Sequence, residues 1–126
     1  MKKEFSKSWK SSKQPRRQRK YRYNAPLHIK GKFMSVHLSK ELREKYGKRN
    51  TAIRNGDTVK VLRGQFKGKT GKIDRVDLKK TKVYIVGIEV SKKDGTKAFC
   101  PFTPSNLIIT ELNLEDKKRV KSLERK

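Results

Sequence analysis

Four basic residues alternate with three glycines between positions 63 and 72. The cations are Arg63, Lys67, Lys69 and Lys72, and the glycines are Gly64, Gly68 and Gly71. Glycine permits positive φ and close backbone approach, so backbone N–H groups and cationic side chains can meet phosphate oxygens together. The alternative is a hairpin loop whose glycines serve turn geometry only, and we expect Gly71 to have mainly that structural role. The spacing favours phosphate binding.

A second basic segment precedes this loop and is interleaved with aromatic residues. Its cations are Lys7, Lys10, Lys13, Arg16, Arg17, Arg19, Lys20, Arg22, Lys30 and Lys32. Such arms fold on binding a polyanion and release counterions. Trp9, Tyr21 and Tyr23 could stack on unpaired bases, although Tyr23 could instead pack on the folded domain. A solvated tail without a partner is the alternative for the whole arm.

A third group of cations follows a short predicted helix over residues 38–47. Ser39 is a good N-cap, Gly47 can end the helix, and Leu38, Leu42 and Tyr46 fall on one face. A plain solvated helix face is the alternative to phosphate contact here. The outward cations are Lys40, Arg43 and Lys45, followed by Lys48, Arg49 and Arg54.

The overall charge points to a polyanionic partner. The chain has 126 residues, 36 Lys and Arg against 12 Asp and Glu, and a formal net charge of +24. Solubility alone asks for a net charge of only about 2–8 in a small domain. Nucleic acid is favoured over a membrane, because no apolar run approaches the roughly 20 residues that a spanning helix needs. No secretory signal is recognisable and Cys100 allows no internal disulfide, so we expect a cytoplasmic chain.

The sequence predicts no catalytic, metal or cofactor site. His28 and His37 with a single cysteine do not make a zinc site, which needs four closely spaced ligands. We expect His28 to donate a hydrogen bond to RNA or to backbone, and Cys100 to be a small buried hydrophobe. No phosphate-cradling nucleotide motif or small-molecule site is present. Asp57, Asp74 and Asp77 are separated by basic residues; turn geometry explains Asp57, and the other two offset neighbouring lysines.

The elements that position these residues divide the chain into four parts. Residues 1–32 are a basic extension with a net charge of +11, from twelve Lys/Arg and one acid, and Pro15, Pro26 and Gly31 should break any regular element there. We expect this arm to be disordered when free. The other parts are a short helical segment (33–53), a β domain (54–112) and a basic terminal helix (113–126) capped by Asn113.

Five or six short strands are predicted over residues 57–112. Residues 83–90 are apolar on both faces for most of their length and should form a central strand. Asp94 and Gly95 form a pair favoured in hairpin turns. Phe66, at the tip of the glycine loop, is expected to cover one end of the domain rather than to act as a wedge against RNA. Short strands joined by tight turns suggest a small closed or half-closed barrel.

Residues 54–87 resemble the KOW motif, which forms SH3-like barrels in ribosomal proteins and transcription elongation factors. The motif residues are the strand at Gly56-Asp57, then Gly64, Lys67-Gly68 and Gly71, then Ile85-Val86-Gly87. Four flanking signatures are similar to the archaeal and eukaryotic form of one KOW family of the large ribosomal subunit, numbered twenty-four in archaea and bacteria and twenty-six in eukaryotes. The flanks are residues 25–28, 38–46, 104–107 and 112–126, in the family's order.

The resemblance covers about residues 16–126 and implies a structural, non-enzymatic protein with a mainly β, SH3-like fold. It implies direct binding to large-subunit ribosomal RNA near its 5′ end, support of subunit assembly, neighbouring ribosomal proteins as partners and a seat near the polypeptide exit tunnel. The alternative is a KOW-type transcription elongation or nucleoid-associated factor. An RNA-acting enzyme is a third hypothesis, which lacks a catalytic constellation to support it.

Overall fold

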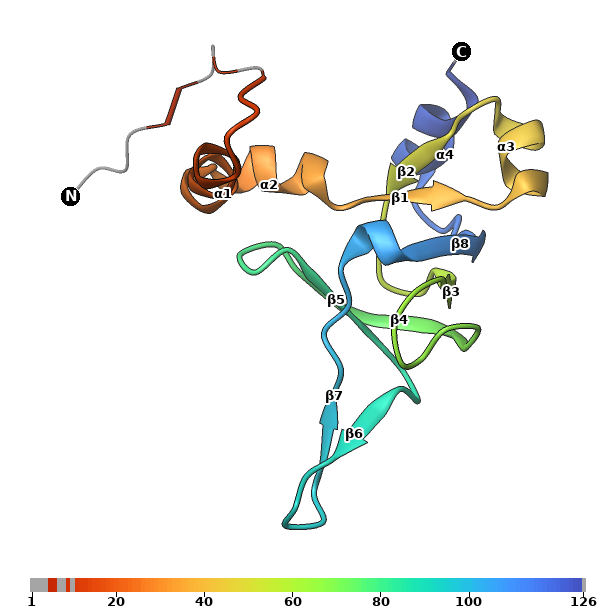
Figure 1. The fold of residues 1–126 in the computed structure, drawn as a ribbon. Helices are drawn as coiled ribbons and strands as arrows, with labels where there is room; N and C mark the ends of the chain where they lie inside the picture. The colour runs from red at the N-terminus through yellow and green to blue at the C-terminus, as the bar shows by residue number, and fades with distance from the viewer. Residues whose placement is uncertain (1–4, 7–8, 10, 126) are drawn as a thin grey trace.

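The computed structural model describes residues 5–6, 9 and 11–125 and centres on a six-stranded sheet (Figure 1). Its strand order is β2-β1-β8-β3-β4-β5. β1 and β8 run parallel, whereas every other neighbouring pair in this sheet is antiparallel. The strands are β1 (Ser35–Leu38), β2 (Asn50–Ala52), β3 (Thr58–Val61), β4 (Thr70–Asp77), β5 (Lys82–Ile85) and β8 (Leu107–Glu111).

The sheet stays open at β2 and β5 within the described residues, so it is not a closed barrel. The small, mainly β domain nevertheless fits the predicted SH3-like fold. A single bridge between Val83 of β5 and Phe102 brings the segment before β8 against the edge strand. β5 is therefore the edge strand of the sheet, and the segment around Phe102 covers part of its open edge.

The core follows from the alternation of apolar and polar residues along the strands. Each inward position of β1, β3 and β8 is almost completely buried, with 0–1% exposure. Ile73 of β4 and Val83 and Ile85 of β5 extend this core across the sheet. The inward residues of the three central strands are Val36, Leu38, Val59, Val61, Leu107 and Ile109.

A separate hairpin projects from the sheet and is formed by β6 (Glu89–Ser91) and β7 (Lys97–Phe99) (Figure 1). The predicted turn at Asp94-Gly95 is confirmed, since Gly95 has φ of 82° and lies at the hairpin tip. The single central strand predicted over residues 83–90 is wrong. The chain leaves β5 at Val86, which is 53% exposed, and turns at Gly87 with φ of 78° before β6 begins.

Two helices occupy the N-terminal arm, α1 (Pro15–Asn24) and α2 (Leu27–Phe33). The prediction that prolines and Gly31 break every regular element there is wrong. Pro15 occupies the first helical position of α1 and Pro26 directly precedes α2. Proline is tolerated at both places because the first N–H groups of a helix lack an intrahelical acceptor.

The third helix, α3 (Lys40–Tyr46), has the predicted caps. The N–H of Leu42 donates to Ser39 Oγ over 3.4 Å, and Gly47 ends the helix with φ of 63°. Leu38, however, belongs to β1 rather than to the helix. Residues 33–53 thus hold two strands, β1 and β2, besides the helix that the sequence predicted.

The C-terminal helix, α4 (Lys117–Glu124), is shorter than predicted. Its N-cap is Asp116, whose side chain accepts the N–H of Lys118, so the prediction that Asn113 caps it is wrong. Leu123 is only 2% exposed, so this face of α4 is packed against the rest of the protein. The preceding 3-10 turn, η1 (Pro104–Asn106), leads directly into β8.

Candidate nucleic-acid interface

The glycine loop between β3 and β4 presents cationic side chains and uses several of its amides in backbone hydrogen bonds. The N–H of Gly68 donates to Val61 O over 2.8 Å, and those of Lys67 and Lys69 donate to Gly64 O and Phe66 O over 3.1 Å each. These three amides, which we expected to be available to phosphate, are therefore already hydrogen-bonded within the protein. The side chains of Arg63, Lys67, Lys69 and Lys72 are all exposed.

The glycines of this loop have different roles. Gly64 and Gly68 adopt φ of 94° and 89°, a region that other residues rarely enter, and a Cβ there would meet nothing within 4 Å. A Cβ on Gly71 would lie 2.6 Å from Ile85 Cγ2 and 2.9 Å from Val86 O. The structural role predicted for Gly71 is therefore confirmed: it lets β4 approach β5.

Phe66 packs on the protein, as predicted. Its half-buried ring meets Phe102 edge-on, with ring centroids 6.0 Å apart. The ammonium of Lys69 lies 5.2 Å from the centroid of Phe66, a cation–π distance. Cys100, predicted to be a small buried hydrophobe, is half-buried and also packs against the core.

Most of the described cations of the arm lie on α1 and α2, and neither helix has a fully buried residue. Lys30 is half-buried and His28 is exposed, both on α2. Lys7 and Lys10 lie outside the described residues. The predicted contact of His28 with RNA stays a prediction. The exposed cations of the arm are Lys13, Arg16, Arg17, Arg19, Lys20, Arg22 and Lys32.

An aromatic cluster ties the arm together. The Trp9 ring stacks on Tyr21 at 4.4 Å, Phe5 lies 4.9 Å from the same ring, and Phe33 meets it edge-on at 6.1 Å. These contacts join the segment before α1 to α2 through Tyr21. Trp9 and Tyr21 therefore stack on each other, and the side chain of Tyr23 is 70% exposed.

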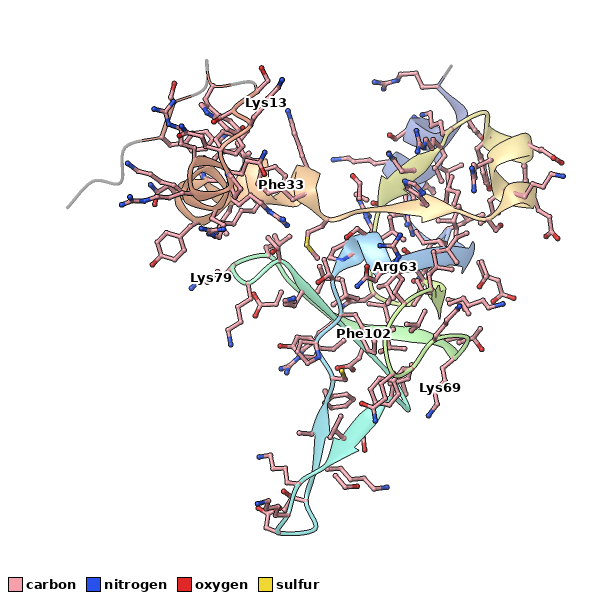
Figure 2. The ribbon with its side chains drawn as sticks, viewed as in Figure 1. Lys13, Phe33, Arg63, Lys69, Lys79 and Phe102 are labelled. Carbon is pink, nitrogen blue, oxygen red and sulfur yellow. The ribbon has the colours of Figure 1, made fainter. Side chains whose placement is uncertain are left out.

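The arm reaches the turn between β4 and β5. Lys30 Nζ donates to Lys79 O over 3.0 Å, which places α2 against this turn. Figure 2 shows Lys79 on the side of the molecule where the arm lies. Asp77 Oδ1 accepts the N–H of Lys80 and shapes the turn. The exposed Lys79 and Lys80 thus extend the basic surface of the arm, and sequence reasoning missed them because their neighbours are distant in the chain.

Several of the cations around α3 form hydrogen bonds or ion pairs within the protein. Arg43 Nε donates to Leu38 O over 2.8 Å, and Lys48 Nζ donates to Ser122 O of α4. Arg54 forms an ion pair with Asp116 while its side chain remains 49% exposed. Lys40 and Arg49 are exposed on the same segment. This third surface therefore combines solvent-exposed cations with side chains that contact α4 and the residue before it.

A buried ion pair joins the sheet to α4. Asp57 is 0% exposed and Arg119 is 5% exposed, and the guanidinium binds both carboxylate oxygens. Asp57 also accepts the N–H of Arg54 and the N–H of Asn113, each over 2.9 Å. Turn geometry alone does not explain Asp57, so that interpretation is wrong. The carboxylate is the anchor of the C-terminal segment.

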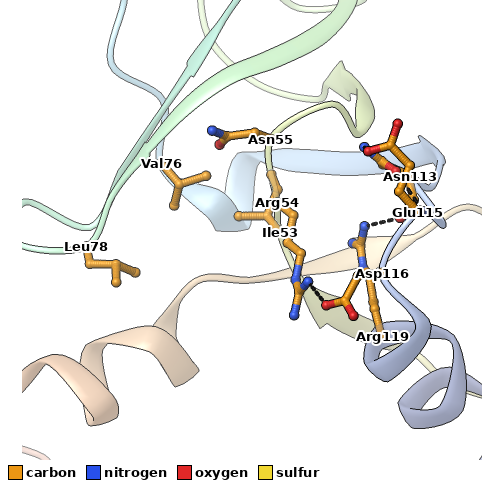
Figure 3. A pocket seen from close by; sticks show the side chains of 9 residues that line it. All are labelled: Ile53, Arg54, Asn55, Val76, Leu78, Asn113, Glu115, Asp116 and Arg119. Atoms are coloured by element: carbon orange, nitrogen blue, oxygen red, sulfur yellow. Dashed lines mark hydrogen bonds and ion pairs between the residues drawn. The ribbon is translucent and has the colours of Figure 1, made fainter.

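A cleft of about 480 Å³ lies beside this anchor, between the sheet and α4 (Figure 3). Ile53, Val76 and Leu78 form its apolar wall, and Glu115 and Asp116 form an acidic rim. The hydrogen bond from Arg54, with a second from the Lys118 N–H, holds the pKa of the Asp116 carboxyl below its ordinary value. The acidic rim disfavours phosphate here, in contrast to the arm.

The described residues offer neither a metal centre nor a membrane span. No group of three or more His, Cys, Asp and Glu side chains in this part of the chain could hold a metal ion. None of the helices described here is long and apolar enough to cross a bilayer. The described surface carries cations, exposed aromatic rings, a depression beside the arm and the cleft beside α4.

Comparisons with known proteins agree with this arrangement. A family model described as the eukaryotic ribosomal proteins L26 and their archaeal counterparts, numbered twenty-four, matches residues 12–126. The large ribosomal subunit protein uL24 of Methanocorpusculum labreanum is 54% identical over 114 residues, covering 90% of this chain and 94% of the relative. The uL24 protein of Methanosphaera stadtmanae is 48% identical over 115 residues, covering 91% and 98%. The chain therefore belongs to this family of ribosomal proteins, which unites eukaryotic L26 with archaeal uL24.

Proposed function

We propose that this chain is a structural constituent of the large ribosomal subunit that binds large-subunit ribosomal RNA directly. Family membership supports a non-enzymatic ribosomal protein that works bound to the ribosome in the cytoplasm. The observation that carries direct RNA binding is the distribution of cations over separate sides of the fold. Lys13, Lys79 and Lys69 mark three of these places in Figure 2.

The proposed mechanism is electrostatic clamping. The loop between β3 and β4 and the surface around α3 dock on folded RNA, while α1 and α2 enter between RNA helices and neutralise phosphates. Phosphate contacts of this kind set position and supply salt-dependent affinity rather than sequence information. Neighbouring ribosomal proteins are the second class of partner, and the acidic cleft beside α4 is the surface best suited to them.

The finer assignments also belong to this proposal: binding near the 5′ end of the RNA, support of subunit assembly and a seat near the polypeptide exit tunnel. They rest on the resemblance to the KOW family. Binding to separate fragments of large-subunit RNA tests the first, and reconstitution without the chain tests the second. Cross-linking of the bound chain to a nascent polypeptide tests the third.

Filter binding to large-subunit ribosomal RNA across a salt series tests the clamp itself. Neutralising about ten phosphates of duplex-like RNA gives a slope of log affinity against log salt near −9. A slope shallower than roughly −3 would contradict the clamp. Cosedimentation with the large subunit through a high-salt wash tests the ribosomal location, and recovery of RNA polymerase instead would favour an elongation factor.

A further inference from the structure

The cleft beside α4 has the dimensions of a binding site. Its volume of about 480 Å³ falls within the range of about 300–1,000 Å³ that ligand sites occupy. Figure 3 shows Val76 and Leu78 on one side of this cleft and Glu115 and Asp116 on the other. Leu78 is 39% exposed, so the apolar wall is left partly uncovered by the protein itself.

We propose that this cleft receives an extended segment of a neighbouring ribosomal protein, an assignment that deepens the proposed function and rests on it. The segment inserts one apolar side chain against Ile53, Val76 and Leu78 and places a lysine or arginine at the rim. Covering the apolar wall removes its surface from water, which drives association without fixing direction. The charge at the rim then sets which segment fits.

Glu115 gives the rim its preference for a cation. Asp116 is paired with Arg54. The charge of Arg119 is offset by the buried Asp57. Glu115 is exposed and has no ion-pair partner among the described residues. The two pairs cancel, so a single negative charge remains at this cleft although the chain as a whole carries +24.

This charge decides among the possible occupants. A nucleotide would bring its phosphates toward the Glu115 carboxylate, and like charges repel. A second copy of the chain would bring a net charge of +24 against +24, which opposes self-association. A segment of another protein with an apolar residue beside a lysine or arginine satisfies both the wall and the rim.

Asn55 offers hydrogen bonds to the backbone of the inserted segment. Its side chain lines the cleft and is exposed. It has no hydrogen-bond partner within the part of the chain that the structure describes. An asparagine amide carries both donors and an acceptor. It can therefore pair with the C=O and N–H groups of an extended peptide, whatever the side chains of that peptide are.

The first test maps the neighbour of Leu78 in the assembled particle. The full chain is made with photo-leucine, a diazirine analogue close in size to leucine, and is assembled into large subunits with the other ribosomal components. We expect position 78 to cross-link to a peptide of another ribosomal protein that carries an apolar residue beside a lysine or arginine. Leu62 is also 39% exposed but does not line the cleft, and it should not yield that peptide. Cross-links from position 78 to RNA, or to no other protein, would overturn the proposal.

The second test uses a synthetic peptide copied from the cross-linked segment as the probe, and fluorescence anisotropy measures its binding to the full chain. Leu78→Asn should weaken binding by about 5- to 30-fold, the loss at a central apolar contact. Glu115→Gln should weaken it by up to about fivefold, as for an exposed ion pair. Leu62→Asn and Glu44→Gln are the matched controls, because both side chains are exposed and lie outside the cleft. Both controls should bind within about twofold of the wild type.

An exchange of charges separates recognition from a loss of fold. Glu115→Lys should weaken binding of the peptide, and a peptide with glutamate in place of its lysine or arginine should bind this variant better than it binds the wild type. Equal affinities of the Leu78→Asn and Leu62→Asn variants, or no gain from the exchange, would overturn the proposal. Affinity for ribosomal RNA should stay within about twofold in Leu78→Asn, because this substitution removes no cation. A wild-type chain that neither binds ribosomal RNA nor joins the subunit would instead refute the proposed function.

Discussion

Arg119 of α4 binds Asp57, the residue before β3, through both terminal guanidinium nitrogens, with Nη1–Oδ1 at 2.6 Å and Nη2–Oδ2 at 2.7 Å. Nη1 also donates to Asn113 O and Nη2 to Ala52 O. A bidentate pair of this kind fixes direction as well as distance. The pair therefore determines how α4 and the segment before it lie on the sheet.

Arg119→Ala should destabilise the fold by about 3–5 kcal/mol, because it leaves the buried Asp57 carboxylate without its counter-ion. Arg119→Lys should also destabilise, since an ammonium cannot reproduce the planar fork. Urea denaturation monitored by circular dichroism measures both. The exposed neighbour Lys118→Ala is the control and should change stability by less than about 0.5 kcal/mol. An Arg119→Ala variant as stable as that control would show that α4 is not held by this pair.

Gly71→Ala and Gly31→Ala should have effects of opposite sign. The new Cβ at position 71 would clash with Ile85 and the carbonyl of Val86, and overpacking of this kind costs about 1–3 kcal/mol. At position 31, in α2, the Cβ meets nothing within 4 Å, and alanine favours helix by up to about 1 kcal/mol. Thermal unfolding of the two variants compares them. Equal melting temperatures would contradict the structural role of Gly71.

Neutralising the loop should lower both RNA affinity and its salt dependence. Replacing Arg63, Lys67 and Lys69 by glutamine removes three exposed cations, and the salt slope falls by about 0.7–0.9 for each phosphate that is no longer neutralised. Filter binding on ribosomal RNA measures the slope. The control replaces Lys92, Lys93 and Lys97 of the hairpin by glutamine, which changes the net charge equally. If the slope falls equally in both variants, net charge rather than the loop governs binding.

Acid should weaken the contact between α4 and the sheet through Asp116. Its folded pKa lies below the ordinary value of 3.8, mainly because of the hydrogen bond from Arg54. A lowered folded pKa means that the contribution to stability is complete above the unfolded pKa and is lost as pH falls through the folded pKa. Asp116→Asn keeps an N-cap and removes the charge. Its melting temperature should fall below wild type at pH 6, with the difference shrinking toward pH 3. A constant difference would contradict the role of the charge.

The arm helices should be the least protected part of the free protein. α1 and α2 contain no fully buried residue, and short helices without a packed face are marginal in water. Amide hydrogen exchange in α1 should be fast in the free chain and slow on RNA binding, whereas β3 and β8 should be protected in both states. This would bear out the predicted disorder of the free arm. Protection of α1 equal to that of β8 without RNA would show a preformed arm.

Local patterns in the sequence were sufficient for several elements. Ser39 and Gly47 mark the ends of α3, and Asp94-Gly95 marks the hairpin tip, because caps and turns depend on neighbouring residues. The KOW motif likewise located β3, the glycine loop and β4. Cation surfaces were identifiable for the same reason, since exposed charges need no distant partner to be recognised.

Features that depend on distant partners could not be predicted. Asp57 lies at the start of the β domain and Arg119 lies 62 residues further on, in α4, and nothing local distinguishes this arginine from the basic residues around it. β1 has only four residues, and its parallel partner β8 lies far along the chain. The aromatic cluster of the arm depends on Phe5 and Trp9 folding back onto Tyr21 of α1, which the composition of the arm does not reveal.

The place of β8 in the sheet has a consequence for how the chain folds. β8 is the last strand in the sequence, yet it lies between β1 and β3, and His37 pairs with Ile108 across more than half of the chain. Such non-local pairing makes folding slow, because the entropy of closing the long loop is lost before the stabilising contacts form. Chains emerge from synthesis N-terminus first, so the edges of β1 and β3 that face β8 stay open until β8 has been synthesised. The basic arm is therefore synthesised, and can meet RNA, before the complete six-stranded sheet can form.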